Sequence, residues 1–299
     1  MSTATTPSAA DDFERHRPRL FGIAYRMLGS ADEAEDAVQD AWPRFAGADR
    51  AGIEQPGAWL AKVVTNLCLT RLTSARARHE SYVGTWLPEP VVTSDGTLGP
   101  LESAEQRDAV STALLLLLER LTPTERAVYV LREAFAYGYR EIAGVLDLTE
   151  ANCRQLHRRA VRRVGEPGSR FEPAPGLRDR LVASFLTAAR EGDLAGLEKL
   201  LAEDVTWWSD GGGKVSAARR PVEGRDKVLR FTVGGMRRFT TDWDLTVAEI
   251  NGAPALVAHS GEDLVGVLTF ELRDGVISEL HAVMNPDKLG FAGRQLARP

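Results

Sequence analysis

Cysteine is scarce in this chain. Its 299 residues include only two cysteines, Cys68 and Cys153, which lie far apart in the sequence. Neither belongs to a Cys-x-x-Cys pair or to a Cys/His spacing of the kind that binds a metal. The sequence therefore argues against a disulfide framework and a structural zinc, and it favours a reducing compartment.

Long apolar runs are missing as well. The longest leucine-rich run, at 113–118, is far shorter than the ~20 apolar residues that span a bilayer. Residues 1–18 contain neither the basic segment nor the apolar segment of a secretory signal. We therefore expect a cytoplasmic protein without a transmembrane helix.

The charge balance is only mildly acidic, with a net charge of −5, and 43% of the residues are hydrophobic. This composition is typical of a globular chain, and the length predicts two or three domains. An acidic total does not exclude a nucleic-acid partner, because phosphate binding depends on local charge. The segment 139–164 has six basic and three acidic side chains and is therefore locally basic.

The hydrophobic pattern divides the chain into blocks. Two blocks are helical in pattern, and the Pro- and Gly-rich stretch between them reads as a linker. After a second Pro- and Gly-rich break, two helical stretches near 177–191 and 193–203 precede a run of strands, with turn signals at Asn251-Gly252 and Asp274-Gly275. Helices followed by such strands indicate an α+β domain. The expected boundaries are 11–80 and 108–165 for the helical domains, 81–107 for the linker, and 175–299 for the α+β domain.

A helix-turn-helix motif is predicted between 122 and 164. The segment Thr122-Pro123-Thr124-Glu125 has the residues of a capped helix start, with a proline at the first helical position. Two more helices follow, near 139–147 and 149–164, and only a short turn separates them. A helix-turn-helix places its second helix in the major groove of DNA.

The last of these helices has a basic face. Cys153, Leu156, Ala160 and Val164 recur at helical spacing and predict a buried stripe. The opposite face carries polar and cationic groups that suit base edges and phosphates. The alternative is an ordinary amphipathic helix whose basic face is only solvated. The candidate DNA-binding residues are Asn152, Arg154, Gln155, Arg158 and Arg159.

An acidic helix is predicted to begin at Ser30, whose hydroxyl can cap it. Acids in a first helical turn favour the helix dipole, which accounts for Asp32 and Glu33 but not for the acids further along. The acidic face therefore suggests a basic protein partner. Pro43 is expected to end or kink this helix. The candidate contact residues are Asp32, Glu35, Asp36, Gln39 and Asp40.

A third helix is predicted over 55–81, with Trp59, Val63 and Leu67 facing inward. Basic groups beside an aromatic-bearing loop suit unstacked DNA, whereas a solvated basic helix end is the other interpretation. The candidate DNA-binding residues of this helix are Lys62, Asn66, Arg71 and Arg76.

Over 11–80 and 108–164 the chain resembles the extracytoplasmic-function sigma factors of bacterial RNA polymerase. The resemblance lies in RLFGIAYRMLGSADEAEDAVQDAW and AWLAKVVTNLCLTRL for region 2, and in LTPTERAVYVLREAFAYGYREIAGVLDLTEANCRQLHRRA for region 4. It implies that region 2 binds the β′ clamp helices of the core polymerase and melts the −10 element. It also implies that region 4 reads the −35 element and meets the β flap.

The last ~125 residues resemble the SnoaL-like (NTF2-like) extension of sigma-J type members. The matching segments are WLPEP (86–90), DGGGK (210–214) and NPDKL (285–289). The resemblance implies two all-α domains followed by an α+β cone that regulates the factor in place of a separate anti-sigma protein. The implied regulatory residues are Trp86, Leu87, Pro88, Asp210, Gly211, Gly212, Gly213, Lys214, Asn285, Pro286, Asp287 and Lys288.

SnoaL-like folds also include isomerases and cyclases with a carboxylate base in an apolar pocket. Here Asp210, His259 and His281 are the candidate proton carriers, with Trp207 and Trp208 as pocket walls. An Asp before glycine is most often a turn former, and a lone strand histidine is most often a packing residue. We therefore expect no enzyme, no cofactor and no metal site. A small-molecule ligand in the pocket remains open.

The sequence thus predicts a sigma factor that directs core RNA polymerase to specific promoters and is regulated in cis by its C-terminal domain. A ligand-sensing helix-turn-helix regulator is one alternative, and it leaves the acidic helix without a role. An isomerase or cyclase fused to a DNA-binding domain is another.

Overall fold

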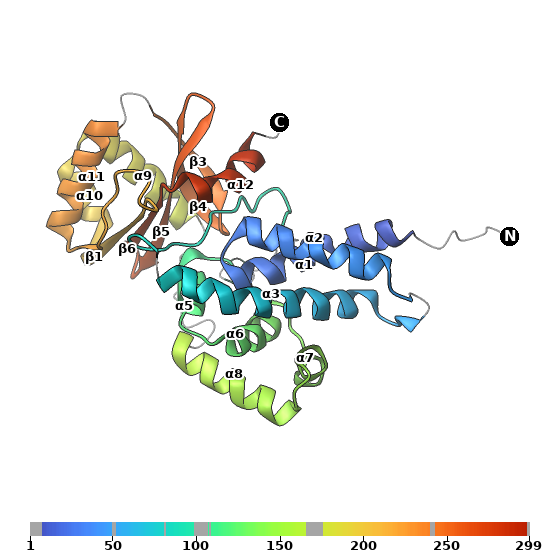
Figure 1. Ribbon diagram of the computed structural model, residues 1–299. Helices are drawn as coiled ribbons and strands as arrows, with labels where there is room; N and C mark the ends of the chain where they lie inside the picture. The colour runs from blue at the N-terminus through green and yellow to red at the C-terminus, as the bar shows by residue number, and fades with distance from the viewer. Residues whose placement is uncertain are drawn as a thin grey trace. The chain divides into compact units, whose positions relative to one another are not determined.

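The computed structural model describes residues 8–49, 52–80, 82–98, 107, 109–165, 176–239 and 243–297, without the side chains of 74–80 and 237–239. Internal contacts divide these residues into two compact units (Figure 1). The helical unit takes its residues from 1–77, 96–109 and 117–167. The sheet unit takes them from 78–95, 110–116 and 168–299. No helix in the described ranges is long and apolar enough to cross a membrane.

The first half of the helical unit contains α1 (Ala9–Leu28), α2 (Ala31–Ala46) and α3 (Pro56–Glu80). As expected, Ser30 caps α2, and its hydroxyl accepts a hydrogen bond from the Glu33 amide at 3.1 Å. Of the two expectations for Pro43, an end or a kink of the helix, the first is wrong, because α2 continues to Ala46. Phe45 holds this last turn, since it is fully buried against Phe13 and Trp59.

The buried face of α3 differs from the predicted one by about one residue. Leu60, Val64 and Cys68 are fully buried, whereas Trp59 and its partners at 63 and 67 are only partly buried. The prediction followed the largest apolar side chains. In the structure the small Ala61 and Cys68 face inward, because small residues allow helices to pack closely.

The second half of the helical unit contains the expected helix-turn-helix. Its helices are α6 (Pro123–Tyr129), the π-helical turn η2 (Val130–Ala134), α7 (Tyr139–Leu146) and α8 (Glu150–Val164). The preceding helix α5 (Thr112–Leu118) belongs largely to the sheet unit. The predicted capping box at the start of α6 is confirmed, because Thr122 and Glu125 bond each other's backbone amides. The predicted stripe on α8 is buried at Cys153, Leu156 and Ala160 and partly buried at Val164.

Two buried arginines connect the halves of the helical unit. Arg126 donates from Nη1 to the carbonyl of Met27 at 2.7 Å. Arg26 donates from Nε to the carbonyl of Ala109 at 3.0 Å, and its guanidinium lies over the Phe135 ring at 5.1 Å. Burial lowers the pKa of Arg26 to about 10, so it remains charged near neutral pH. These buried hydrogen bonds join the two halves of the helical unit.

The sheet unit is the α+β domain that the sequence predicts. Its six strands lie in the order β2-β1-β6-β5-β4-β3, and only β1 and β6 pair in parallel. The strands are β1 (Leu201–Asp210), β2 (Val222–Glu223), β3 (Asp244–Ile250), β4 (Ala253–Ser260), β5 (Asp263–Arg273) and β6 (Val276–Val283). The helices are α9 (Leu177–Glu191), α10 (Leu194–Leu200), α11 (Arg225–Phe239) and α12 (Pro286–Leu296).

Both faces of this sheet are covered. Because side chains alternate along a strand, neighbouring residues on β1 belong to different cores. Trp207 packs with the helices α9, α10 and α11, whereas Trp208 packs on the opposite side. That opposite side is covered by α12 and by the Pro-rich segment 82–95, whose Leu87 and Val92 belong to its core. The segment that reads as a linker is thus a packed layer of the sheet unit.

Leu87→Ala should destabilise the sheet unit by about 2–5 kcal/mol, because it removes a fully buried side chain from a packed core. The free energy of unfolding in urea and hydrogen exchange of the β5 and β6 amides measure this loss. Leu194→Ala is the matched control, since Leu194 is 50% exposed. Equal effects of the two substitutions would show that the segment does not stabilise the sheet.

Candidate functional site

The outward face of α8 divides into free and paired residues. Asn152, Gln155 and Arg158 are exposed, and their side chains have no hydrogen-bond or ion-pair partner among the described residues. Arg154 is also exposed but pairs with Glu150 at 2.7 Å, one turn earlier on the helix. The three free side chains lie on the surface that the sequence predicts for DNA.

Arg159 has a different environment. The buried carboxylate of Glu125 on α6 accepts ion pairs from Arg159 at 3.0 Å and from Arg163 at 2.6 Å. Burial acts to raise the pKa of Glu125, but hydrogen bonds from Thr122 and the two arginines outweigh it and lower that pKa. The charged carboxylate therefore fixes α8 against α6, and Arg159 helps to position the helix.

On α3, Arg71 pairs with the acidic helix. Its guanidinium lies 2.6 Å from the carboxylate of Asp40 and 3.7 Å from that of Asp36. The structure therefore brings together residues that the sequence assigns to two different partners, DNA and protein. The side chain of Arg76 lies outside the described residues.

Lys62 contacts the helix-turn-helix. Its ammonium donates to the Gly144 carbonyl at 2.9 Å and to the Asp147 carboxylate at 2.7 Å, where α7 ends. Asn66, one turn further along α3, is partly buried. A candidate −10 residue therefore contacts the end of α7, the helix that precedes the candidate −35 helix α8.

The remaining residues of the acidic face lie along α2. Asp36, Gln39 and Asp40 are exposed, while Asp32 and Glu35 are partly buried. Glu35 forms an ion pair with Arg17 on α1 and accepts a hydrogen bond from Gln39. The exposed part of the predicted protein-binding face is thus its second and third turns.

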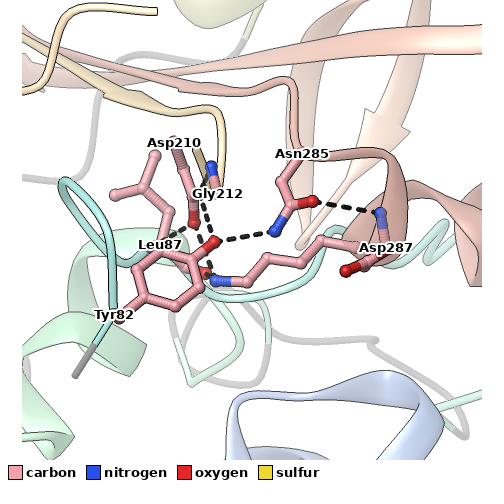
Figure 2. Close-up of polar contacts among 7 residues, drawn as sticks. Tyr82, Leu87, Asp210, Gly212, Asn285 and Asp287 are labelled. Atoms are coloured by element: carbon pink, nitrogen blue, oxygen red, sulfur yellow. Dashed lines mark hydrogen bonds and ion pairs between the residues drawn. The ribbon is translucent and has the colours of Figure 1, made fainter. Parts of the chain in front are cut away.

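In the sheet unit, the three sequence motifs meet at the end of β1 (Figure 2). Asp210 is fully buried, and both of its carboxylate oxygens are occupied. Oδ1 accepts from the Tyr82 hydroxyl at 2.5 Å and from the Gly212 amide at 3.1 Å. Oδ2 accepts from the Leu87 amide at 2.8 Å and from the Lys288 ammonium at 2.7 Å. We call Tyr82, Leu87, Asp210, Asn285 and Lys288 the clamp cluster.

Lys288 completes the contacts to the segment 82–95. Its ammonium donates to the Leu87 carbonyl at 2.6 Å in addition to Asp210. It also lies over the rings of Trp86 at 4.3 Å and Tyr82 at 4.7 Å, where a cation is attracted to the aromatic face. The Asp210–Lys288 ion pair therefore binds both backbone groups of Leu87, the N–H through Asp210 and the C=O through Lys288. The Leu87 side chain takes no part in these bonds.

The third motif supplies the start of α12. Asn285 caps the helix by accepting from the Asp287 amide, and Pro286 takes the first helical position. The other end of the Asn285 amide donates to the Tyr82 oxygen at 2.8 Å. Burial, followed by the hydrogen bond to the Asp210 carboxylate, raises the pKa of Tyr82 well above its usual range. Tyr82 therefore stays protonated and acts as a donor.

The glycines of DGGGK are required by two constraints. Gly212 and Gly213 have φ of 57° and 73°, a left-handed conformation that favours glycine. A Cβ on Gly212 would clash with the Asn285 amide, and a Cβ on Gly211 would lie 2.8 Å from Ala217. Lys214, after the turn, is exposed and pairs with Asp287. The turn brings the chain close enough for the clamp cluster to form.

Two further polar contacts to the segment 82–95 are not evident from the sequence. Asn251 bonds both backbone groups of Val91 at 2.9 and 3.2 Å. Gln295 bonds both backbone groups of Val92 at 2.9 and 3.0 Å. Asn251 was predicted only as a turn residue, and neither Gln295 nor Tyr82 lies in a motif. Pro88, between these contacts and the clamp cluster, is buried.

The proposed proton carriers do not face the apolar cavity of this unit. The cavity lies on the α9 and α11 side of the sheet, with Trp207 in its wall as expected. Asp210, His281 and Trp208 belong to the opposite face, because they alternate with the lining residues along β1 and β6. His259 is also absent from the described lining. The expectation that Trp208 forms a pocket wall is therefore wrong.

The described lining contains no carboxylate, histidine or cysteine. A general base of the isomerase type needs one of these groups beside the substrate. Within the described residues there is also no group of three or more potential metal ligands.

Two family models match the chain in the expected order. Sigma-70 region 2 matches residues 13–78, and Sigma-70 region 4 matches residues 111–164. The chain is 37% identical over 303 residues to the ECF RNA polymerase sigma factor SigJ of Mycobacterium tuberculosis, covering 95% of this chain and 94% of that one. It is 32% identical over 293 residues to the probable ECF sigma factor SigI of the same species, covering 97% of each.

The fold comparison agrees. The crystal structure of Mycobacterium tuberculosis SigJ superimposes with a TM-score of 0.73 at 34% identity, covering 94% of this chain and 98% of that one. The similarity therefore extends through both helical regions and the sheet unit.

Lys288→Met should destabilise the sheet unit by about 3–5 kcal/mol, because it leaves the buried Asp210 carboxylate without its cation. The double variant with Asp210→Asn should recover part of this loss, since no buried charge then remains. Urea unfolding of the single and double variants measures the coupling. Lys214→Met, in an exposed pair, should cost at most about 1 kcal/mol. Additive losses would contradict the assigned ion pair.

Proposed function

Because this chain belongs to the ECF RNA polymerase sigma factors, we propose that its sheet unit regulates it in cis by holding the segment 82–95. A sigma factor directs core RNA polymerase to promoters, so core RNA polymerase and promoter DNA are the partners of this chain. Such a factor works where the polymerase and the chromosome are, in the cytoplasm. Its relatives are transcription factors, and we propose that the sheet unit acts without catalysis and without a separate anti-sigma factor.

The observation that carries this proposal is the bonding of the Leu87 peptide by Asp210 and Lys288. Residues 82–95 lie between the region 2 match, which ends at 78, and the region 4 match, which begins at 111. A free connection of this length lets its ends separate widely. A segment packed on the sheet keeps its ends at a fixed separation. The clamp cluster therefore limits how far the connection allows regions 2 and 4 to separate.

We infer the sign of the regulation from the helical unit. Lys62 of region 2 contacts Asp147 of region 4 at the end of α7, so the two regions touch within the helical unit. The −35 and −10 elements are about 25 base pairs apart, or on the order of 85 Å at 3.4 Å per base pair. Regions in contact cannot reach both elements at once. We therefore assign the observed arrangement to a closed state that the clamp cluster favours.

For promoter recognition, we propose that Asn152, Gln155 and Arg158 read the −35 element, because they are exposed and free of partners among the described residues. Arg154 joins them after leaving Glu150, and Arg159 positions the helix through Glu125. At the −10 element we propose Lys62, Asn66, Arg71 and Arg76, of which Lys62 and Arg71 must first leave their acidic partners.

For polymerase binding, we propose that the exposed turns of α2 meet the β′ clamp helices through Asp36, Gln39 and Asp40. Asp32 and Glu35 extend this surface toward the start of the helix. Region 4 would meet the β flap, as in the family. The ligand-sensing regulator and the fused isomerase both leave this acidic face without a role.

Gln155→Ala should weaken binding to the cognate −35 sequence by about 1–3 kcal/mol and leave binding to random DNA almost unchanged. Arg159→Ala should instead weaken both, because it loosens α8 from Glu125. Fluorescence anisotropy with the holoenzyme on cognate and scrambled duplexes measures the difference. Equal losses on the two DNAs for Gln155→Ala would reduce that residue to a phosphate contact.

Tyr82→Phe should raise promoter-dependent transcription about tenfold, because a hydrogen bond to a charged group contributes about 1.5–3 kcal/mol to holding the closed state. Run-off transcription with core RNA polymerase and full-length protein measures the yield. Core affinity should stay unchanged for this variant and fall for Asp36→Lys. Lys214→Met, outside the clamp cluster, is the matched control. Unaltered transcript yield at unaltered core affinity would refute the proposed regulation.

A further inference from the structure

Tyr139, the first residue of α7, contacts the DNA-reading face of α8. Its ring is partly buried, and the guanidinium of Arg154 on α8 lies over it, 5.2 Å from the ring centroid. A guanidinium in that position is attracted to the electron-rich face of the ring. The two helices of the helix-turn-helix are therefore linked through an arginine of the candidate −35 surface.

Hydrogen bonds at the hydroxyl end of Tyr139 fix its ring. His157 Nε2 lies 2.7 Å from the Glu133 carboxylate, which can only accept, so Nε2 carries a proton. In the neutral imidazole Nδ1 is then an acceptor, and the Tyr139 hydroxyl donates to it at 3.1 Å. The His157 ring also packs edge to face against Tyr139, with ring centroids 5.9 Å apart. The Tyr139 ring is thus held in place before any DNA binds.

Arg154 differs in this respect from Arg158, the other arginine of the surface without a buried partner. The side chain of Arg154 is 49% exposed, yet its guanidinium contacts both the Tyr139 ring and the Glu150 carboxylate. Arg158 is exposed and has neither a ring nor an acid as a partner among the described residues. A long side chain loses rotamer freedom when it binds, so a guanidinium that is already held loses less.

The ring contact leaves the N–H edge of the Arg154 guanidinium available. An arginine stacks on an aromatic ring through its flat face, whereas its N–H donors point outward in the guanidinium plane. One of them, on Nη2, donates to Glu150 at 2.7 Å. Both partners of that pair are exposed, and exposed ion pairs contribute little to stability. Guanine O6 and N7, which accept two N–H groups from an arginine, can therefore take the place of Glu150.

We propose that Tyr139 is a positioning residue for −35 recognition, whose ring holds the Arg154 guanidinium while its N–H edge passes from Glu150 to a guanine. This inference rests on the proposed reading of the −35 element by α8. It assigns the preference for one base pair to a side chain on α7 that acts only through Arg154. The attraction between a cation and a ring at an exposed site corresponds to about two- to fivefold in that preference.

The test measures which bases the holoenzyme selects. Core RNA polymerase with the full-length protein is mixed with duplexes randomised over the −35 region, and bound and unbound DNA are sequenced. Arg154→Ala identifies the base pair that Arg154 reads, as the position whose preference is lost. Tyr139→Leu should lower the preference at that base pair about two- to fivefold and leave the positions read by Gln155 and Arg158 unchanged. A general loosening of the fold would instead lower the preference at every position.

Two conservative replacements separate the ring from the hydroxyl and from the fold. Tyr139→Phe keeps the ring and its packing against His157, so it should keep the base preference. A phenylalanine with three fluorine atoms on its ring has nearly the same shape but lacks the negative face, so it should lose the preference as Tyr139→Leu does. Combining Tyr139→Leu with Arg154→Ala should give the same base preferences as Arg154→Ala alone.

The inference is overturned if Tyr139→Leu lowers the preference at all positions equally, or if the fluorinated ring selects the same bases as Tyr139→Phe. It is also overturned if Arg154→Ala changes no position while Gln155→Ala does. In that case α8 still reads the −35 element, and only the role of Tyr139 is refuted. If none of the α8 variants changes any position, the proposed reading of the −35 element fails as well.

Discussion

A single buried carboxylate, that of Asp210, determines how the sheet unit is assembled. Such a group is tolerated in an interior only when a cation and several hydrogen-bond donors surround it. Its partners come from the segment 82–95, from the turn after β1 and from the start of α12. These three segments must therefore fold together or leave the charge uncompensated. For that reason a Pro- and Gly-rich stretch becomes part of a domain that begins almost a hundred residues later.

The alternation of side chains along β1 separates two roles. Ser209 faces the cavity, while the next residue, Asp210, faces the opposite core. Because the Asp210 carboxylate binds the segment 82–95, it is unavailable to a molecule in the cavity. The described lining of the cavity contains no charged side chain. One face of the sheet carries the apolar cavity. On the other face, the buried Asp210–Lys288 ion pair binds the segment 82–95.

In the helical unit, charge complementarity decides which basic residues are free. Glu125 forms ion pairs with both Arg159 and Arg163, and the acids of α2 form ion pairs with Arg71. A face that reads as uniformly basic in the sequence is therefore partly paired within the unit. The contact of Lys62 with Asp147 extends this pairing to both DNA-reading regions. In the proposed mode of promoter binding, Lys62 and Arg71 exchange these internal partners for DNA, whereas Arg159 keeps Glu125.

The sequence by itself determined what depends on near neighbours in the chain. The capping box at Thr122, the bounds of α9 and the turns at Asn251 and Asp274 all followed from local chemistry. The motifs WLPEP, DGGGK and NPDKL identified the segments that meet, but not how. Tertiary structure alone decided the buried face of α3 and the roles of Tyr82 and Gln295. The hydrogen bonds of Tyr82 with Asn285 and of Gln295 with Val92 join residues about two hundred positions apart. No local preference specifies them, because their free energy exists only once packing has excluded water.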